Sequence, residues 1–210
     1  NSEVEAALSV LQDDTGNACL YQQNGILMHH SRIFLDIYSF IFLCLNNLYK
    51  SLINLKIEIY ISDVTRNSLQ LWINDLSRDS YMKAGLNEGN LTVINSETIK
   101  QEHSIFIQAL NTLIDYSKVL LPKAIDVPTH ISQLKDILSL SVYSSMKDSY
   151  SYQIPWLCLD SIINELFKSI DPDLTINLGS LVRNLNNNLS LEDKKIALYQ
   201  LLNFSLLTYV

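Results

Sequence analysis

The chain has 210 residues, of which 48% are hydrophobic and 18% charged, and its net charge is −7 at pH 7. Many apolar side chains at a modest net charge exclude an intrinsically disordered protein, because burial can offset the conformational entropy lost on folding. The 15 basic residues form no run longer than Lys194-Lys195, so the charge pattern predicts no direct contact with nucleic acid, which needs a clustered basic surface.

The first residues predict a short helix followed by a turn. The segment 2–11, SEVEAALSVL, carries acidic residues in its first turn, where they complement the helix dipole, and DDTGN at Asp13–Asn17 ends it. The N-terminus has no charged and apolar regions of a signal peptide, and residues 206–210 form an apolar end. From these two ends we expect a fragment of a larger protein.

The stretch from Ile33 to Leu48, IFLDIYSFIFLCLNNL, is apolar on nearly every face that a helix would present. An amphipathic helix would keep a polar face, so this stretch predicts a helix enclosed by other elements, from about Leu27 to Lys50. Polar residues such as Asp36 leave too few consecutive apolar positions to cross a bilayer, which needs about 20. We therefore expect no transmembrane segment.

Leu55–Ile61 allows two interpretations. The sequence LKIEIYI alternates strictly and is rich in β-branched residues, as strands are. It also continues a helical stripe that runs through Leu48, Leu52 and Ile59. The only candidate partner strand is the short Leu91–Ile94, and an isolated strand pair is marginally stable, so the prediction is a helix.

The polar segment Asp75–Asn95 contains Gly85 and Gly89 and predicts a long loop. It is the best candidate for a hinge that separates residues 1–74 from 96–210. Apolar residues then recur at helical spacing from Ser96 onward. The predicted helices after the loop span 96–120, 129–147, 155–170, 172–189 and 190–210, with Ser190 as the N-cap of the last.

These elements predict an all-α fold, written as a single helical segment over residues 1–210. After Pro128 the helices repeat about every 20 residues, so that pairs repeat in the range of HEAT and armadillo arrays. Stacked helical pairs in an α-solenoid are therefore the preferred architecture. A compact helical bundle gives the same pattern and is the alternative.

The cysteines and histidines give no sign of a metal site. Cys19, Cys44 and Cys158 are odd in number and far apart, which argues against a disulfide framework and a zinc site and predicts reduced thiols in a cytoplasmic or nuclear protein, including one at the nuclear envelope. Adjacent His29-His30 cannot easily face one metal. His103 lies on the apolar stripe of its helix and is expected to be a partly buried core residue.

One motif resembles a known enzyme family. Asp13-Asp14-Thr15-Gly16-Asn17 resembles the aspartate-rich motif of isoprenoid synthases, and this resemblance implies magnesium-diphosphate binding in an all-helical enzyme. Asn17 replaces the last carboxylate, and no second acidic motif follows. No phosphate-binding glycine loop and no GxSxG motif are present either. The prediction is therefore no enzyme, with no catalytic, cofactor-binding or metal-binding residues.

The expected function is a structural scaffold or protein–protein interaction module in a large eukaryotic assembly, such as a nuclear pore, a vesicle tether or a HEAT-type chromatin regulator. Its partners would be other protein subunits, and no small-molecule ligand is expected. Tyr143, Tyr150 and Tyr152 lie in a serine-rich segment predicted as a loop and are the candidate partner contacts, together with 75–95. A bundle that binds an apolar ligand or a membrane surface is the alternative, and a magnesium-dependent helical enzyme ranks last.

Overall fold

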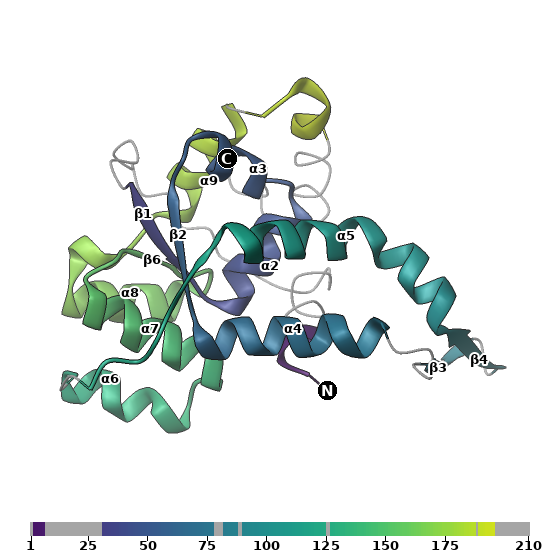
Figure 1. Ribbon diagram of the computed structural model, residues 1–210. Coiled ribbons are helices and arrows are strands. Elements are labelled where there is room, and N and C mark those ends of the chain that lie inside the picture. Colours follow the sequence, from purple (N-terminus) through teal and green to yellow (C-terminus); the bar gives the residue numbers. More distant parts are fainter. Residues whose placement is uncertain are drawn as a thin grey trace.

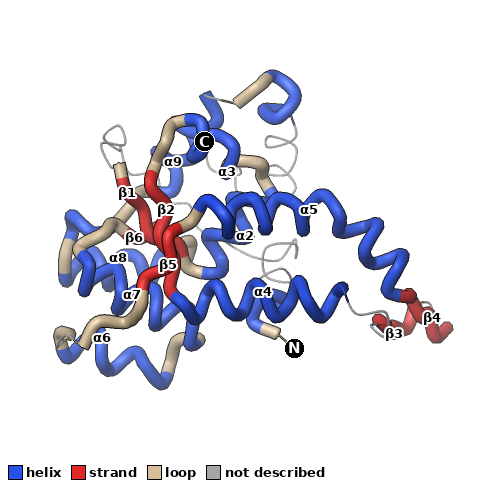
Figure 2. The backbone as a smooth tube through the Cα atoms, viewed as in Figure 1, coloured by secondary structure: helices blue, strands red, loops and turns tan. Residues whose placement is uncertain are grey.

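The computed structural model describes residues 2–6, 31–77, 82–87, 90–124, 127–187 and 189–195. Within these ranges, four parallel strands form a sheet in the order β5-β2-β1-β6, and two others form an antiparallel hairpin (Figures 1 and 2). The strands are β1 (Arg32–Leu35), β2 (Glu58–Ser62), β3 (Met82–Asn87), β4 (Asn90–Asn95), β5 (Lys118–Leu120) and β6 (Trp156–Leu157).

Helices lie on both sides of the four-stranded sheet. They are α2 (Ile37–Leu45), α3 (Tyr49–Asn54), α4 (Asp63–Ser77), α5 (Ser96–Tyr116), α6 (Thr129–Gln133), α7 (Leu140–Tyr152), α8 (Ser161–Ile170) and α9 (Leu178–Asn187), with the 3-10 turns η1 (Leu134–Asp136) and η2 (Pro172–Leu174). Residues 3–6 and 191–195 add short helical turns near the two ends of the described chain.

Alternation along each strand divides the core in two. Ile33 and Leu35 of β1 face a cluster built from α2, α3, α4, α5 and α9, whereas Phe34 faces a second cluster formed with α6, α7 and α8. Successive side chains of a strand point to opposite faces, so a strand buried on both sides is apolar throughout. The protein is therefore a three-layer α/β structure. The all-α prediction is wrong for both the solenoid and the compact bundle, because neither contains this sheet.

The enclosed helix predicted from about Leu27 to Lys50 is wrong because Asp36 divides the apolar run. Its described residues, from Ser31 onward, form a central strand, β1, then α2 and the start of α3. The Asp36 carboxylate accepts a hydrogen bond from the Ser39 N–H at 2.8 Å, which makes it the N-cap of α2. A run without a polar face can be buried as one enclosed helix, and it can be buried equally well as a strand followed by a helix. Within the described residues no helix is long and apolar enough to cross a membrane.

The helix predicted for Leu55–Ile61 is also wrong. This segment contains β2, which pairs with β1 on one side and with β5 on the other. The alternation was the correct signal, but its partner strands are distant in the sequence and parallel, so no hairpin marks them. Helices connect such parallel strands, as the βαβ geometry requires.

The predicted loop at 75–95 contains regular structure. Helix α4 continues to Ser77, and β3 and β4 then pair as a hairpin. Helices α4 and α5 run side by side away from the sheet, with the hairpin at their far end (Figure 1). Trp72 of α4 packs edge-on against His103 and Phe106 of α5, at ring-centroid distances of 6.4 and 6.0 Å. The proposed division of the chain at this segment stays a prediction.

The later helices begin where capping residues or prolines place them, and those predicted between residues 96 and 189 are shorter than predicted. Of the helix predicted for 190–210, residues 196–210 lie outside the described residues. The start at Ser96 is confirmed, but α5 ends at Tyr116 because the following residues pair with β2 as β5. The segment 155–170 contains β6 before α8, and 129–147 and 172–189 are each interrupted. Ser190 is confirmed as a cap, since its Oγ accepts a hydrogen bond from the Asp193 N–H at 3.1 Å.

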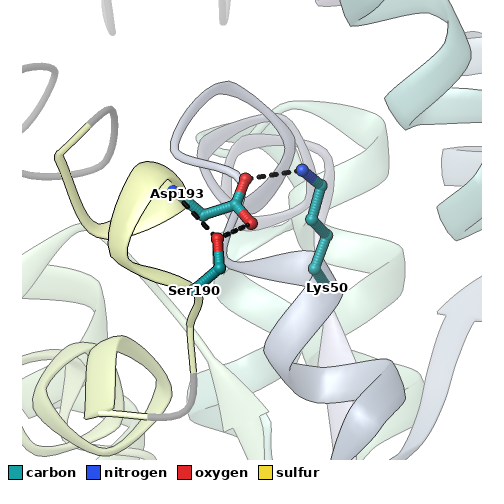
Figure 3. Close-up of polar contacts among 3 residues, drawn as sticks. All are labelled: Lys50, Ser190 and Asp193. Carbon is teal, nitrogen blue, oxygen red and sulfur yellow. Dashed lines mark hydrogen bonds and ion pairs between the residues drawn. The ribbon is translucent and has the colours of Figure 1, made fainter.

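An ion pair joins the last described helical turn to α3 (Figure 3). Lys50 Nζ lies 2.6 Å from Oδ1 of Asp193, and the Ser190 hydroxyl donates to Oδ2 at 2.7 Å. Hydrogen bonds from Lys50 and Ser190 lower the pKa of Asp193. This contact lies at the opposite end of the sheet from the start of α4 (Figure 1).

Ile61 tests the central position of β2. Ile61 is fully buried, so Ile61→Ala leaves a cavity and is expected to lower the free energy of unfolding by about 2–4 kcal/mol in urea titrations. Leu71 on α4 is 63% exposed, and Leu71→Ala is expected to change it by less than about 0.5 kcal/mol. Equal effects of the two substitutions would contradict the buried strand.

Candidate functional site

The carboxyl edge of the parallel sheet is where the fold places a binding site. In open parallel sheets, ligands bind beyond the carboxyl ends of the strands, at the point where the strand order reverses. Here the chain passes from β1 to β2 and β5 on one side and then returns to β6 on the other side of β1. Asp36 directly follows β1, and Asp63 directly follows β2.

Asp36 is a buried carboxylate whose two oxygens both bind protein donors. Oδ1 accepts from the backbone N–H and the hydroxyl of Ser39 at 2.8 and 3.0 Å, and Oδ2 accepts from the indole N–H of Trp156 at 3.1 Å. Burial raises the pKa of Asp36 to about 6, although these hydrogen bonds oppose the shift. Asp36 therefore fastens the start of α2 to β6.

Buried hydroxyl groups join α4 to α7, and we call this group, with Asp148, the polar seam. Its members, all fully buried, are Ser62, Thr65, Ser141, Ser145 and Asp148. The last three recur at spacings of four and three and so share one face of α7. The Ser62 hydroxyl donates to Thr65 Oγ1 at 3.0 Å, and Thr65 Oγ1 lies 3.3 Å from Ser145 Oγ.

Asp148 is the unusual member of the polar seam. Both its carboxylate oxygens are buried, and neither accepts a hydrogen bond of normal geometry from the described residues. Burial, and next the negative charge of Asp63, raise the pKa of Asp148 to about 6, while Lys147 and Ser144 oppose the shift. A buried carboxylate without well-formed hydrogen bonds costs free energy, so this arrangement needs an explanation beyond folding.

Asp63, at the start of α4, is close enough for its negative charge to act on this carboxylate. It is half-buried, and its Oδ1 accepts a hydrogen bond from the Val64 N–H at 2.9 Å. The site thus combines one carboxylate that is closed off from water with a second that reaches solvent. Two neighbouring carboxylates repel each other, and a cation between such groups removes the repulsion.

Residues 34–169 match the family described as the PIN domain associated with the TPR-GreAB-C-PIN system. The matched range runs from β1 to the end of α8 and includes Asp36, Asp63 and Asp148. Because it covers more than half of the sequence, the chain belongs to this family. No match was found among curated proteins or among solved structures.

Membership of this family corrects the predicted function. PIN domains are typically metal-dependent nucleases, so the prediction of no enzyme is wrong, as are the HEAT-type scaffold, the nuclear pore and the vesicle tether. The prediction that the protein makes no direct contact with nucleic acid is also not supported. The association with a TPR system does support protein partners, as expected from the sequence.

The predicted partner-binding tyrosines lie on α7, not on a loop. Tyr143, Tyr150 and Tyr152 are half-buried against the second core cluster. The Tyr152 hydroxyl donates to the Leu121 carbonyl at 2.8 Å, and Lys123 Nζ lies 3.8 Å from the centre of its ring. Their contact with a partner stays a prediction.

The remaining candidate residues are buried or half-buried in the core, or they lie outside the described residues. Cys44 and Cys158 are buried and free, as predicted, and half-buried His103 packs on Trp72. The motif at 13–17, Cys19 and His29-His30 lie outside the described residues.

Sequence reasoning missed the three aspartates of the carboxyl edge. A usable signal existed for two of them, because IFLD and IYISD each place an aspartate at the end of a short β-rich apolar run. Asp148 carried no such signal. It lies in a tyrosine- and serine-rich segment, and only helix packing brings it to Asp63.

The pair Asp63 and Asp148 fits a divalent cation with oxygen ligands. Mg²⁺ is commonly held by one or two carboxylates, keeps several waters and takes further oxygens from a phosphate. Within the described residues no group of three or more His, Cys, Asp and Glu side chains is close enough to hold a metal. The fit therefore rests on two carboxylates, and chiefly on the Asp148 oxygens, which accept no hydrogen bond of normal geometry from these residues.

Asp148→Asn tests the cost of this buried charge without any metal. Folding raises the pKa of Asp148 from 3.8 to about 6, so the group destabilises the folded state progressively as pH rises through that interval. In EDTA, Asp148→Asn should raise the free energy of unfolding by about 1–2 kcal/mol near pH 7.5 and leave it nearly unchanged near pH 4.

Asp193→Asn is the matched control, measured by the same urea titrations. The pKa of Asp193 is lowered, so its stabilising effect is present at neutral pH and is lost as pH falls. This substitution should therefore destabilise the protein slightly near pH 7.5. Destabilisation by Asp148→Asn at that pH would show that the Asp148 carboxylate has a partner in the folded protein.

Proposed function

We propose that this protein is a divalent-metal-dependent nuclease in which Asp63 and Asp148 hold the cation beside a phosphodiester of a nucleic-acid strand. The observation that carries the proposal is the buried Asp148 carboxylate, which accepts no hydrogen bond of normal geometry from the described residues and is repelled by the charge of Asp63. Membership of a family of PIN domains supports the same reaction class.

A cation bound there would neutralise charge on the phosphate and supply an activated water at neutral pH. The protein itself would position the two carboxylates and shield one of them from water. Asp148 is fixed on a fully buried face of α7, and Asp63 is oriented by its hydrogen bond to the Val64 N–H. The contact between Thr65 and Ser145 holds the two elements together.

Positive charge for a nucleic-acid backbone is available beside this pair. Lys147 precedes Asp148 and acts electrostatically on it, and Arg66 is exposed on the first turn of α4. A net charge of −7 makes nonspecific attraction to phosphates weak, so local cations at the site gain importance. We propose that Lys147 and Arg66 contact the substrate backbone.

The family association also bears on partners. We propose that protein partners of the TPR-containing system position this nuclease, with Tyr143, Tyr150 and Tyr152 and the 75–95 segment as the candidate contacts. An intracellular location, cytoplasmic or nuclear, is proposed with it, because reduced and buried Cys44 and Cys158 suit a reducing compartment.

Cleavage of a fluorescently labelled single strand, offered as RNA and as DNA, tests the reaction. Asp63→Asn and Asp148→Asn should lower kcat/KM in Mn²⁺ by about 100-fold or more, because they remove metal ligands. Asp193→Asn is the control and should cleave at the wild-type rate. Cleavage by the two site variants at that rate, or unchanged cleavage in EDTA, would contradict the proposal.

The pH dependence supplies a second prediction. A proton on Asp148 competes with the cation, so the cleavage rate at subsaturating Mn²⁺ should increase as pH rises through about 6 and then level off. The measurement is the initial rate across a pH series at constant ionic strength. A rate that falls over the same interval would show that Asp148 acts in its protonated form.

A further inference from the structure

Glu3 joins the two helices that carry Asp63 and Asp148. Its Oε1 accepts hydrogen bonds from the N–H and the hydroxyl of Ser141, at 3.2 and 2.8 Å, and Ser141 lies in the first turn of α7. Its Oε2 accepts from the Ser68 hydroxyl of α4 at 3.5 Å. One carboxylate therefore bridges α4 and α7 through two different oxygens.

This bridge lies at one end of the polar seam. Ser141 and Asp148 occupy the same face of α7, and Ser68 and Asp63 belong to the same helix α4. Between the two ends, Thr65 and Ser145 form a second polar link. Two polar links at different positions along the helix pair restrain its spacing and rotation more tightly than one link does.

The segment that carries Glu3 is itself anchored. Val4 is fully buried in the first core cluster. Ser2 and Glu5 form a capping box, in which the Glu5 N–H donates to Ser2 Oγ at 3.2 Å and the Ser2 N–H donates to Glu5 Oε2 at 3.3 Å. The turn is thereby held at the position where Glu3 reaches both helices.

The charge of Glu3 also acts on the start of α2. Burial, and next the charges of Glu3 and Asp36, raise the pKa of Tyr38, so both carboxylates act on the same side chain at the start of α2. Glu3 also lies outside residues 34–169, the range that matches the family. Glu3 thus reaches the helix pair from outside the matched range.

We propose that Glu3 is a positioning residue, which sets the separation and orientation of Asp63 and Asp148 by bridging α4 and α7. The inference rests on the proposed metal-dependent function. Glu3 does not bind the cation, since its oxygens are taken by Ser68 and Ser141, and it acts through the helices.

Two substitutions distinguish the hydrogen bonds that Glu3 makes from its negative charge. Glu3→Ala removes both acceptors and leaves the Ser141 N–H without its partner. Glu3→Gln keeps one acceptor for Ser141, and its amide N–H can donate to the Ser68 hydroxyl, which is both donor and acceptor. Glu3→Gln should therefore preserve positioning that Glu3→Ala loses.

The first measurement determines the relative position of α4 and α7 in the absence of metal. Spin labels at Asn74 on α4 and Lys147 on α7 report the distance distribution between the helices by pulsed electron paramagnetic resonance. Glu3→Ala should broaden this distribution, while Glu3→Gln and the distant Asp193→Asn should leave it as in the wild type. An unchanged distribution in Glu3→Ala would overturn the inference.

The second measurement is the affinity for Mn²⁺ by titration calorimetry on the unlabelled full chain. Glu3→Ala should weaken binding about tenfold, the range in which residues behind metal ligands act, and Glu3→Gln should restore most of it. Wild-type affinity in Glu3→Ala would overturn the positioning role. If the wild type itself binds no Mn²⁺, the proposed function fails, and the distance distribution still decides whether Glu3 sets the helix pair.

Discussion

The buried carboxylate of Asp36 organises the centre of this protein. It ends a strand, begins α2 through its hydrogen bonds to Ser39, and receives the indole N–H of Trp156 from β6. A charged group at this depth is tolerated only because each oxygen has a donor. The strand order reverses at β1, so the same contact joins the two halves of the sheet and creates the edge at which the site lies.

Asp148 is a second buried carboxylate, and its environment is the opposite of that of Asp36. It is also buried, but it accepts no hydrogen bond of normal geometry from the described residues, and the charge of Asp63 adds repulsion. Folding alone would favour a neutral side chain at this position. Groups that cost stability are often retained for function, which agrees with the proposed role of this carboxylate pair in holding a cation. The surrounding hydroxyl groups of the polar seam keep the two helices in register around it.

The sequence identified several local features correctly. The Ser96 helix start, the Ser190 cap and the burial of Cys44 and Cys158 follow from capping chemistry and apolar periodicity, which act over a few residues. The β alternation at 55–61 was visible too, but the choice of helix was wrong because a central parallel strand has no nearby partner. For the same reason, the run from Ile33 was assigned to one helix although Asp36 divides it.

The sequence by itself determined that the chain has a large apolar core and that two aspartates follow short β-rich runs. It also determined the residues at which several helices begin. Only the tertiary structure decided that these runs are parallel neighbours, that Asp148 comes to face Asp63, and that Glu3 spans α4 and α7. The physical reason is the range of the interactions. Caps and periodicity are local, whereas strand pairing and the encounter of carboxylates 85 positions apart, from 63 to 148, depend on how distant segments pack.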